Sequence, residues 1–358
     1  MKTRIILLVF LCSAFSARAQ VWTDAETLPL YGKAVEETYT RYSRLPAALK
    51  EESRPRVWSL GQNSAGLYIR FRTDSPTLWV RWESATSHVM NHMSPTGSRG
   101  LDLYVRAGDK WHFLAAAKPD LKAAVSERKI FSNMEPQMRE YMLYLSLYDG
   151  VSSLHIGTEE GHPALQPQLQ SPRSDRPIVM YGTSITQGGC VSRPGMVYTS
   201  IMSRELDREF VNLGFSGNAL LDLDIARLMA SVENPAAYVL APLCNATVED
   251  VEARGDAFFR ILRDAHPDVP IIFVQALRYA GEGFDQKMTE DRNARRKAFK
   301  KLYFSLKSAG ERKIYFADPG ADKSFADAES SVDGTHLTDL GTQRFAKTLL
   351  PVLKKALR

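Results

Sequence analysis

The second half of the chain alternates short apolar runs with longer stretches of helical character, and this alternation constrains the fold more than any other feature. Strands that alternate with helices pair in parallel and are covered by helices on both faces. The pattern therefore predicts an α/β fold with a five-stranded parallel sheet. The apolar runs cover residues 178–181, 210–213, 237–240, 271–274 and 314–317, and the helical stretches cover 197–207, 226–231, 251–265, 287–308 and 338–357.

The first half of the chain has a different period. From about residue 54 to residue 159, apolar and polar side chains alternate in short runs, which is typical of half-buried strands. Gly108-Asp109 and Asp149-Gly150 separate pairs of these runs and predict tight hairpin turns. Closely spaced strands of this kind indicate an antiparallel sandwich or jelly roll. The runs cover residues 66–72, 77–82, 100–105, 111–114, 141–148 and 151–156.

A proline-rich segment separates the two halves. Residues 162–177 contain four prolines and few apolar side chains, as expected of a linker between domains. We therefore predict an N-terminal β-sandwich domain over residues 20–162, a linker over 163–176 and an α/β domain over 177–358.

The first 19 residues have the three parts of a signal peptide. Lys2 and Arg4 are basic, residues 5–15 are apolar, and Ala17-Arg18-Ala19 fits a cleavage site. The apolar run is too short to span a bilayer, so we expect no membrane span in the mature protein. The sequence predicts export to the periplasm or the medium, with cleavage after Ala19.

Cleavage also changes the apparent charge. Losing Lys2, Arg4 and Arg18 reduces the net charge from +5 to +2. A nearly neutral protein lacks the clustered positive charge that phosphate binding requires, so no nucleic-acid partner is expected. Two cysteines remain, Cys190 and Cys244, and in an oxidising compartment they either pair or stay as buried thiols. The oligomeric state is not readable from the sequence.

A serine and a histidine–aspartate pair stand where the α/β fold places its chemistry, at the carboxyl ends of strands. Ser184 follows the first apolar run, and Asp333 precedes His336 by three residues. A serine hydroxyl needs a base, usually a histidine oriented by a carboxylate, to act as a nucleophile. Taken alone, Ser184 is better interpreted as a helix-capping serine than as a nucleophile. A phosphate loop and a G-x-S-x-G elbow are excluded, because no Gly-Lys follows and position 186 is Thr186.

Acyl transfer also needs hydrogen-bond donors aimed at the developing oxyanion. Gly217 follows the second apolar run and offers a backbone N–H, and Asn245 follows the third and offers a side-chain amide. The alternatives are an ordinary turn glycine and, for Asn245-Ala246-Thr247, a glycosylation sequon.

The order Ser184, Gly217, Asn245, His336 on separate strand ends resembles the SGNH (GDSL-type) hydrolases. Asn212-Leu-Gly-Phe-Ser-Gly217 and Asp333-Gly-Thr-His336 are similar to that superfamily's motifs. Gly100-Leu-Asp-Leu-Tyr104 resembles the G-x-D-L-Y motif of a branch that carries an N-terminal β-sandwich. The resemblance implies a flavodoxin-like hydrolase domain preceded by that sandwich. Two positions depart from the pattern, because Thr183 replaces the aspartate of Gly-Asp-Ser and Ala241 replaces an aspartate before Asn245.

Carried over by position, the resemblance implies Ser184 as nucleophile, His336 as base and Asp333 as its orienting carboxylate. The oxyanion hole would comprise the amides of Ser184 and Gly217 and the side chain of Asn245. The resemblance implies no metal and no organic cofactor. The expected activity is that of an exported serine esterase which removes acetyl groups from polysaccharides. Alternatives are a lipid or aryl-ester hydrolase and an inactive carbohydrate-binding protein.

Other polar residues receive weaker interpretations. Arg193 and Tyr198 follow the Ser184 loop and are candidates for the pocket lining, although Arg193 could equally pair with a structural carboxylate. Asp102 lies on an expected strand and is interpreted as a buried structural group. His88 and His92 have the i, i+4 spacing of a helical zinc site, but no glutamate follows His88 and the segment reads as a loop. No metal site is therefore assigned to this segment. The alternative is that the segment lies near the cleft and contacts the substrate.

Overall fold

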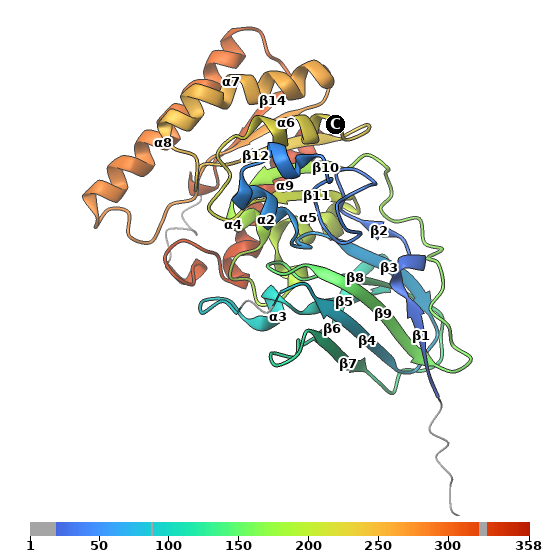
Figure 1. Cartoon of the computed structure of the whole chain (residues 1–358). Coiled ribbons are helices and arrows are strands. Elements are labelled where there is room, and N and C mark those ends of the chain that lie inside the picture. The colour runs from blue at the N-terminus through green and yellow to red at the C-terminus, as the bar shows by residue number, and fades with distance from the viewer. Residues whose placement is uncertain (1–18, 87–88, 322–327) are drawn as a thin grey trace, which may run out of the picture.

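The computed structural model describes residues 19–86, 89–321 and 328–358. Of the expected signal peptide (residues 1–19), residues 1–18 lie outside the described residues. An antiparallel β domain and an α/β domain pack directly against each other (Figure 1). This arrangement confirms the fold expected from the two periods of the sequence, while the domain limits at 162–163 and 176–177 stay predictions.

The α/β domain is built on a five-stranded parallel sheet with the order β11-β10-β12-β13-β14. The sheet is parallel throughout, and nearly every residue in its three central strands is buried. This order places the topological switch point between β10 and β12, where sheets of this kind bind ligands. The strands are β10 (Ile178–Gly182), β11 (Phe210–Gly214), β12 (Ala237–Ala241), β13 (Ile271–Val274) and β14 (Ile314–Ala317).

Helices cover both faces of this sheet. On one face, Ile178, Met180 and Val239 pack against Met202 and Phe345 of two helices. On the other face the alternate residues of the same strands pack on the remaining helices. The first face carries α5 (Tyr198–Leu206) and α9 (Asp339–Ala356), and the second carries α6 (Leu223–Ala230), α7 (Val248–Ala265) and α8 (Gln286–Ser308).

The N-terminal domain consists of two antiparallel sheets packed face to face. Their core contains Trp82, Leu103, Leu143 and Ile156, all 1% exposed or less. This confirms the predicted sandwich. One sheet has the order β1 (Gln20–Asp24), β9 (Val151–Glu159), β4 (Leu78–Ser84), β7 (Val125–Phe131), and the other has the order β2 (Leu30–Tyr31), β3 (Tyr68–Thr73), β8 (Arg139–Tyr144), β5 (Leu101–Ala107), β6 (Lys110–Ala117).

One of the two predicted hairpins is correct and the other is wrong. Gly108 and Asp109 connect β5 and β6, which pair antiparallel up to Ala107 and Lys110. Asp149 and Gly150 do not close a hairpin, because β8 and β9 lie in different sheets. Asp149 is instead buried and forms an ion pair with the equally buried Arg99 (3.2 Å). A tertiary charge pair therefore overrides the local turn signal.

Short helices complete the structure. The segment beginning at residue 54, expected to be extended, instead forms a helix with Pro55 at its first position, where a missing N–H costs nothing. These short elements are α1 (Leu49–Glu52), α2 (Pro55–Gly61), α3 (Pro95–Ser98), α4 (Ser184–Gln187) and the 3₁₀ turns Ala25–Thr27, Pro194–Met196, Pro319–Ala321 and Ala328–Ser330.

A buried arginine joins the two domains at the end of β11. The guanidinium of Arg44 donates to the carbonyls of Asn212 (3.0 Å) and Gly214 (2.8 Å), and also to those of Leu60 and Asn63. Burial lowers the pKa of Arg44 to about 9, and the four carbonyl acceptors take the place of a carboxylate. The N-terminal domain is thus fixed to the strand end that carries Gly217.

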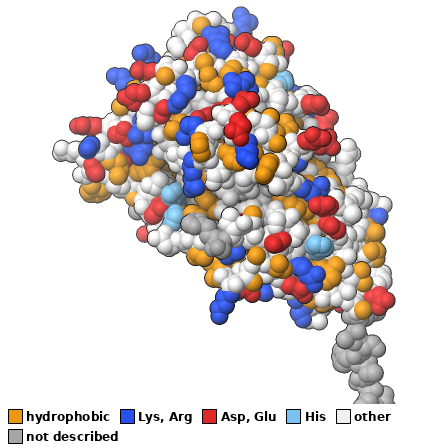
Figure 2. Space-filling model, in the orientation of Figure 1, with side chains coloured by type: hydrophobic (Ala, Val, Ile, Leu, Met, Phe, Trp, Pro, Cys, Tyr) orange, Lys and Arg blue, Asp and Glu red, His pale blue; other side chains and the backbone are white. Residues whose placement is uncertain are grey.

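On the face shown in Figure 2, Lys and Arg side chains are interspersed with Asp and Glu. Across the described residues, no helix combines the length and the apolar character that crossing a bilayer requires.

Candidate active site

Ser184 lies where β10 ends and α4 begins. Its amide is the first of the helix, a position without an intrahelical acceptor. Thr183 caps the helix, since its hydroxyl accepts from the amide of Ile185. The turn is tight: a Cβ at Gly214 would lie 2.2 Å from the backbone nitrogen of Gln187. The loop can therefore approach β11 only because position 214 has no side chain.

His336 and Asp333 complete a chain of hydrogen bonds with Ser184. His336 Nε2 lies 2.9 Å from Ser184 Oγ, and His336 Nδ1 lies 2.6 Å from Asp333 Oδ2. Asp333 Oδ1 accepts from the amides of Thr335 (3.0 Å) and His336 (2.8 Å). The carboxylate is thereby held against Nδ1 of the imidazole, so that Nε2 can accept the proton of the serine hydroxyl.

The environment of Asp333 favours its charged form. Partial burial would raise the pKa of its carboxyl group, but hydrogen bonds from the backbone and ring of His336 and from the Thr335 amide outweigh that effect. The pKa of Asp333 is therefore held below its usual value. At neutral pH this carboxylate stays ionised beside His336.

The two oxyanion candidates lie on the neighbouring strand ends. Gly217 has a φ of +69°, and within the described part of the chain its amide has no hydrogen-bond acceptor. Asn245 Oδ1 accepts from the amide of Ala219 (3.2 Å), which orients the side chain and leaves Nδ2 as its donor. With the amide of Ser184, these groups supply three donors of the type that stabilises a tetrahedral intermediate.

Gln187 connects these loops and was not singled out in the sequence. Its Oε1 accepts from the amide of Ser216 (3.0 Å), and its Nε2 donates to Asn63 Oδ1 (3.0 Å) and to the Leu147 carbonyl (3.2 Å). The side chain is fully buried. Gln187 therefore ties the Ser184 helix to the Gly217 loop and to the N-terminal domain at once. No local pattern marks it, since a glutamine at the end of a short helix is common.

Arg54 holds the other side of the Gly217 loop. Its guanidinium donates to Asp222 Oδ1 (2.6 Å) and to the carbonyl of Asn218 (2.7 Å), the residue that follows Gly217. Asp222 is buried, and Arg54 is about one-third exposed. The N-terminal domain thereby positions one of the candidate oxyanion donors.

Asp102 explains the G-x-D-L-Y motif physically. Its carboxylate is fully buried and accepts from Arg193 Nη1 (2.7 Å) and from the amide of Gly195 (2.8 Å). Tyr104 accepts a second bond from Arg193 (2.6 Å). Burial raises the pKa of Asp102, and the charge of Arg193 opposes that rise. The motif thus anchors the segment that follows the Ser184 helix, in agreement with the structural interpretation of Asp102.

Arg193 and Tyr198, the two candidates for the pocket lining, both make hydrogen bonds that involve the segment around Ser184. Arg193 is paired with Asp102, with its guanidinium 3.7 Å from the ring centre of Phe113. Tyr198 is completely buried behind the loop, and its hydroxyl lies 2.7 Å from Thr186 Oγ1. Both side chains thus support the loop, and their contact with substrate stays a prediction.

His92 is the one residue of the His88–His92 pair that the structure describes, and it lies at the site. Its ring centre is 5.6 Å from that of His336. The N-terminal domain thus brings a histidine next to His336, whereas the sequence offered contact of this segment with the site only as an alternative.

Cys190 and Cys244 are both free thiols. Burial, with the charge of Asp333 adding to it, raises the pKa of Cys190 to about 12.

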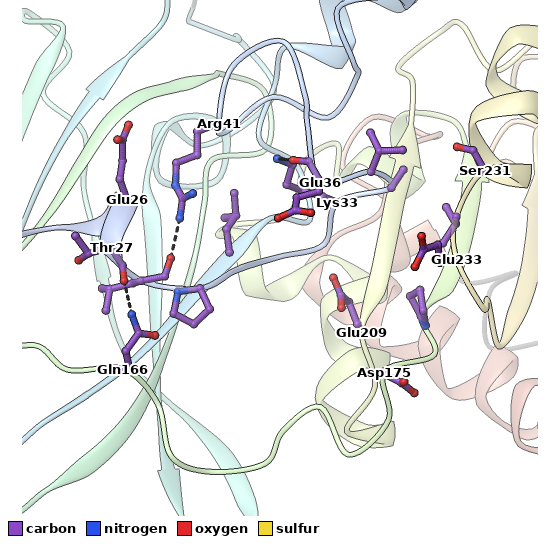
Figure 3. A pocket seen from close by; sticks show the side chains of 17 residues that line it. Glu26, Thr27, Lys33, Glu36, Arg41, Gln166, Asp175, Glu209, Ser231 and Glu233 are labelled. Carbon is purple, nitrogen blue, oxygen red and sulfur yellow. Dashed lines mark hydrogen bonds between the residues drawn. The ribbon is translucent and has the colours of Figure 1, made fainter.

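A large cavity lies away from these residues. It has a volume of about 760 Å³ and is bounded by the segment from Glu26 to Arg41 on one side and by Glu209 and Glu233 on the other (Figure 3). None of the five candidate catalytic residues lines it. The candidate active site therefore lies at the strand ends, outside this cavity.

A doubly wound parallel sheet that brings a serine, a histidine and an aspartate together at its strand ends defines the class of SGNH-type hydrolases. The chain belongs to the GDSL-like lipase/acylhydrolase family, whose sequence model matches residues 175–354. A second model, for the N-terminus of SGNH-type esterases, matches residues 20–163. The protein is thus an esterase or acylhydrolase, as the resemblance implied.

Solved structures agree with this assignment. A GDSL-like lipase from Bacteroides ovatus is 32% identical with a TM-score of 0.89, and the match covers 95% of this chain and 98% of that one. The salicylyl-acyltransferase SsfX3 is 18% identical (TM-score 0.76, coverage 95% and 98%). A family two carbohydrate esterase from Clostridium thermocellum is 15% identical (TM-score 0.59, coverage 82% and 93%). The last two share the fold. Among curated proteins, none matches the sequence.

Proposed function

We propose that the protein is an exported serine esterase that removes acetyl or other short acyl groups from polysaccharides. One observation carries the proposal: an unbroken chain of hydrogen bonds runs from Ser184 Oγ through the His336 ring to Asp333. An alignment of this kind lets an imidazole take the hydroxyl proton while a carboxylate stabilises the resulting charge.

The reaction follows from this alignment. Ser184 Oγ attacks the ester carbonyl as His336 Nε2 takes its proton, and the amides of Ser184, Gly217 and Asn245 bind the oxyanion. The intermediate collapses, the C–O bond to the alcohol breaks, and His336 returns the proton to the leaving oxygen. Water, deprotonated by His336, then attacks the acyl-enzyme, and acid and free Ser184 are released.

One observation supports a carbohydrate substrate. The family two carbohydrate esterase from Clostridium thermocellum, which shares this fold, was solved with cellohexaose.

The test is a comparison of esters. Hydrolysis of p-nitrophenyl acetate and p-nitrophenyl palmitate is measured, followed by acetate release from acetylated xylan and acetylated pectin. The proposal predicts a preference for acetate over palmitate and acetate release from at least one glycan. A preference for palmitate favours the lipid hydrolase. Glycan binding with no hydrolysis of any ester favours the inactive carbohydrate-binding protein.

Export is part of the proposal and has its own test. Expressed with its natural N-terminus in a Gram-negative host, the protein is expected in the periplasm or the medium, beginning at Gln20. Cytoplasmic protein that retains Met1 would contradict it.

A further inference from the structure

Four side chains with metal-binding atoms meet beside Ser184. They are His92, Cys190, Asp333 and His336, and one ligand atom from each lies within 4.8 Å of all the others. They come from three distant parts of the chain, including the N-terminal domain. The i, i+4 spacing of His88 and His92 therefore does not create this cluster, which exists only in the folded protein.

Specific contacts join the two loops that carry His92 and Cys190. Ser94 Oγ donates to the carbonyl of Ser192 (2.9 Å), which joins the His92 loop to the Cys190 loop. A Cβ at Gly97 would lie 2.3 Å from the carbonyl oxygen of Val191, so the two loops are packed backbone to backbone. The loops that carry His92 and Cys190 are thus packed against each other next to the ligand cluster.

The individual ligands are suitably presented. His92 Nδ1 lies 3.1 Å from Asn91 Oδ1, which leaves Nε2 to face outward from that bond. The rings of His92 and His336 are tilted by 52° and so are not stacked flat against each other. Cys190 is a free thiol at a positive φ of +69° in the loop that follows the Ser184 helix.

We propose that His92, Cys190, Asp333 and His336 bind a borderline-soft divalent cation, Zn²⁺ being the representative, and that binding switches the esterase off. Two imidazoles, a thiolate and a carboxylate are ligands that Zn²⁺ prefers, whereas Mg²⁺ and Ca²⁺ prefer oxygen. Tetrahedral ligands at Zn–N of about 2.0 Å and Zn–S of about 2.3 Å lie roughly 3.3–3.5 Å apart, so side chains must draw in by about 1 Å.

Inhibition follows from the shared histidine. Coordination occupies a lone pair of the His336 ring, and the Cys190 thiol releases its proton to solvent as it binds. His336 then loses either its contact with Ser184 or its contact with Asp333, which are 2.9 Å and 2.6 Å long. The inhibitory part of the inference rests on the proposed function, whereas the binding site itself does not.

Binding is tested by calorimetric titration of the full-length mature protein with ZnCl₂. The inference predicts one Zn²⁺ per chain for the wild type and for Ser184→Ala, and no comparable heat with MgCl₂. His92→Phe keeps a ring but removes its nitrogens, and Cys190→Ser removes the thiolate. Each is expected to weaken binding at least 10-fold, while His112→Phe, on the exposed face of β6, binds as the wild type does.

Inhibition is tested by measuring the rate of p-nitrophenyl acetate hydrolysis as a function of Zn²⁺ concentration. Addition of EDTA is expected to restore the rate. Each variant is compared with its own metal-free rate, and the inhibitory concentration is expected to rise at least 10-fold in His92→Phe and Cys190→Ser. Absence of binding, or equal binding by both variants, overturns the site. Binding without inhibition overturns the switch. A protein inactive without metal refutes the proposed function, while calorimetry still decides the site.

Discussion

The imidazole Nε2 of His336 lies 2.9 Å from the hydroxyl oxygen of Ser184, across 152 residues of sequence. This contact depends on the parallel sheet, which brings the end of β10 and the loop before α9 to the same edge. On its other side the same ring is held by Asp333. Substitutions can therefore test this chain of hydrogen bonds and the elements that position it.

Asp333→Asn is expected to lower kcat for p-nitrophenyl acetate by about 10³–10⁴-fold. The amide places a donor against His336 Nδ1, which disfavours the tautomer that accepts from Ser184. Steady-state kinetics at pH 7.5 provide the measurement. Asp268→Asn, at an exposed carboxylate paired with Lys313, serves as the matched control and keeps the wild-type rate. An unchanged rate in Asp333→Asn would remove the carboxylate from the mechanism.

Asn245→Ala is expected to lower kcat by about 10²–10³-fold with little change in KM, the usual effect of losing one oxyanion donor. The matched control is Asn293→Ala on the exposed side of α8. If the two variants have equal kcat values, Asn245 does not bind the oxyanion.

Arg54→Met tests whether the N-terminal domain positions the Gly217 loop. Losing the contacts with Asn218 and Asp222 frees the loop, and misplacement of a catalytic donor by about 1 Å costs up to about 10²-fold in rate. We expect kcat to fall about 10- to 100-fold, measured below the melting temperature. Arg81→Met removes an exposed ion pair with Glu127 and is expected to change neither rate nor melting temperature measurably. Equal kcat values for the two variants would contradict the positioning role.

Glu209 gives a prediction about pH and stability. Burial raises the pKa of its carboxyl group, and a hydrogen bond from the amide of Gly32 opposes that rise. The pKa of this carboxyl group is therefore higher in the folded state than in the unfolded state. Its contribution to the free energy of unfolding is fully present at acid pH and is lost as the pH rises through the folded-state pKa. Glu209→Gln keeps an acceptor for Gly32 and removes the charge.

The melting temperature of Glu209→Gln, relative to the wild type, is therefore expected to increase between pH 4 and pH 7. Thermal unfolding followed by circular dichroism at these two values measures it. Glu233→Gln changes an exposed carboxylate beside the same cavity and is expected to show no such trend. A difference for Glu209→Gln that stays constant with pH would show that the carboxyl group titrates normally.

The parallel sheet was predictable because its strands are short, apolar and largely buried. The runs 271–274 and 314–317 coincide with β13 and β14. Burial on both faces removes any need for alternation, so composition alone marks such strands. The strand Val125–Phe131 was missed because charged residues interrupt it, and Gln20–Asp24 because it directly follows the expected signal peptide.

The candidate catalytic residues were also predictable, since Ser184 closely follows an apolar run and Asp333 precedes His336 by three residues in a polar segment. Their supports were not. Arg44, Arg54 and Gln187 act through hydrogen bonds to backbone atoms far away in the chain. Such bonds leave no periodicity in the sequence. The same holds for His92, which approaches His336 only when the two domains pack together.

The most direct test of the account is covalent labelling with a fluorophosphonate, followed by intact-mass and peptide mass spectrometry. Nucleophilic Ser184, activated by His336, is predicted to give one adduct per chain on the peptide containing Ser184. Ser184→Ala is predicted to give none, and His336→Ala to react at least 10²-fold more slowly. An unlabelled wild type, or an adduct that persists in Ser184→Ala, would contradict the assignment of Ser184 as the nucleophile.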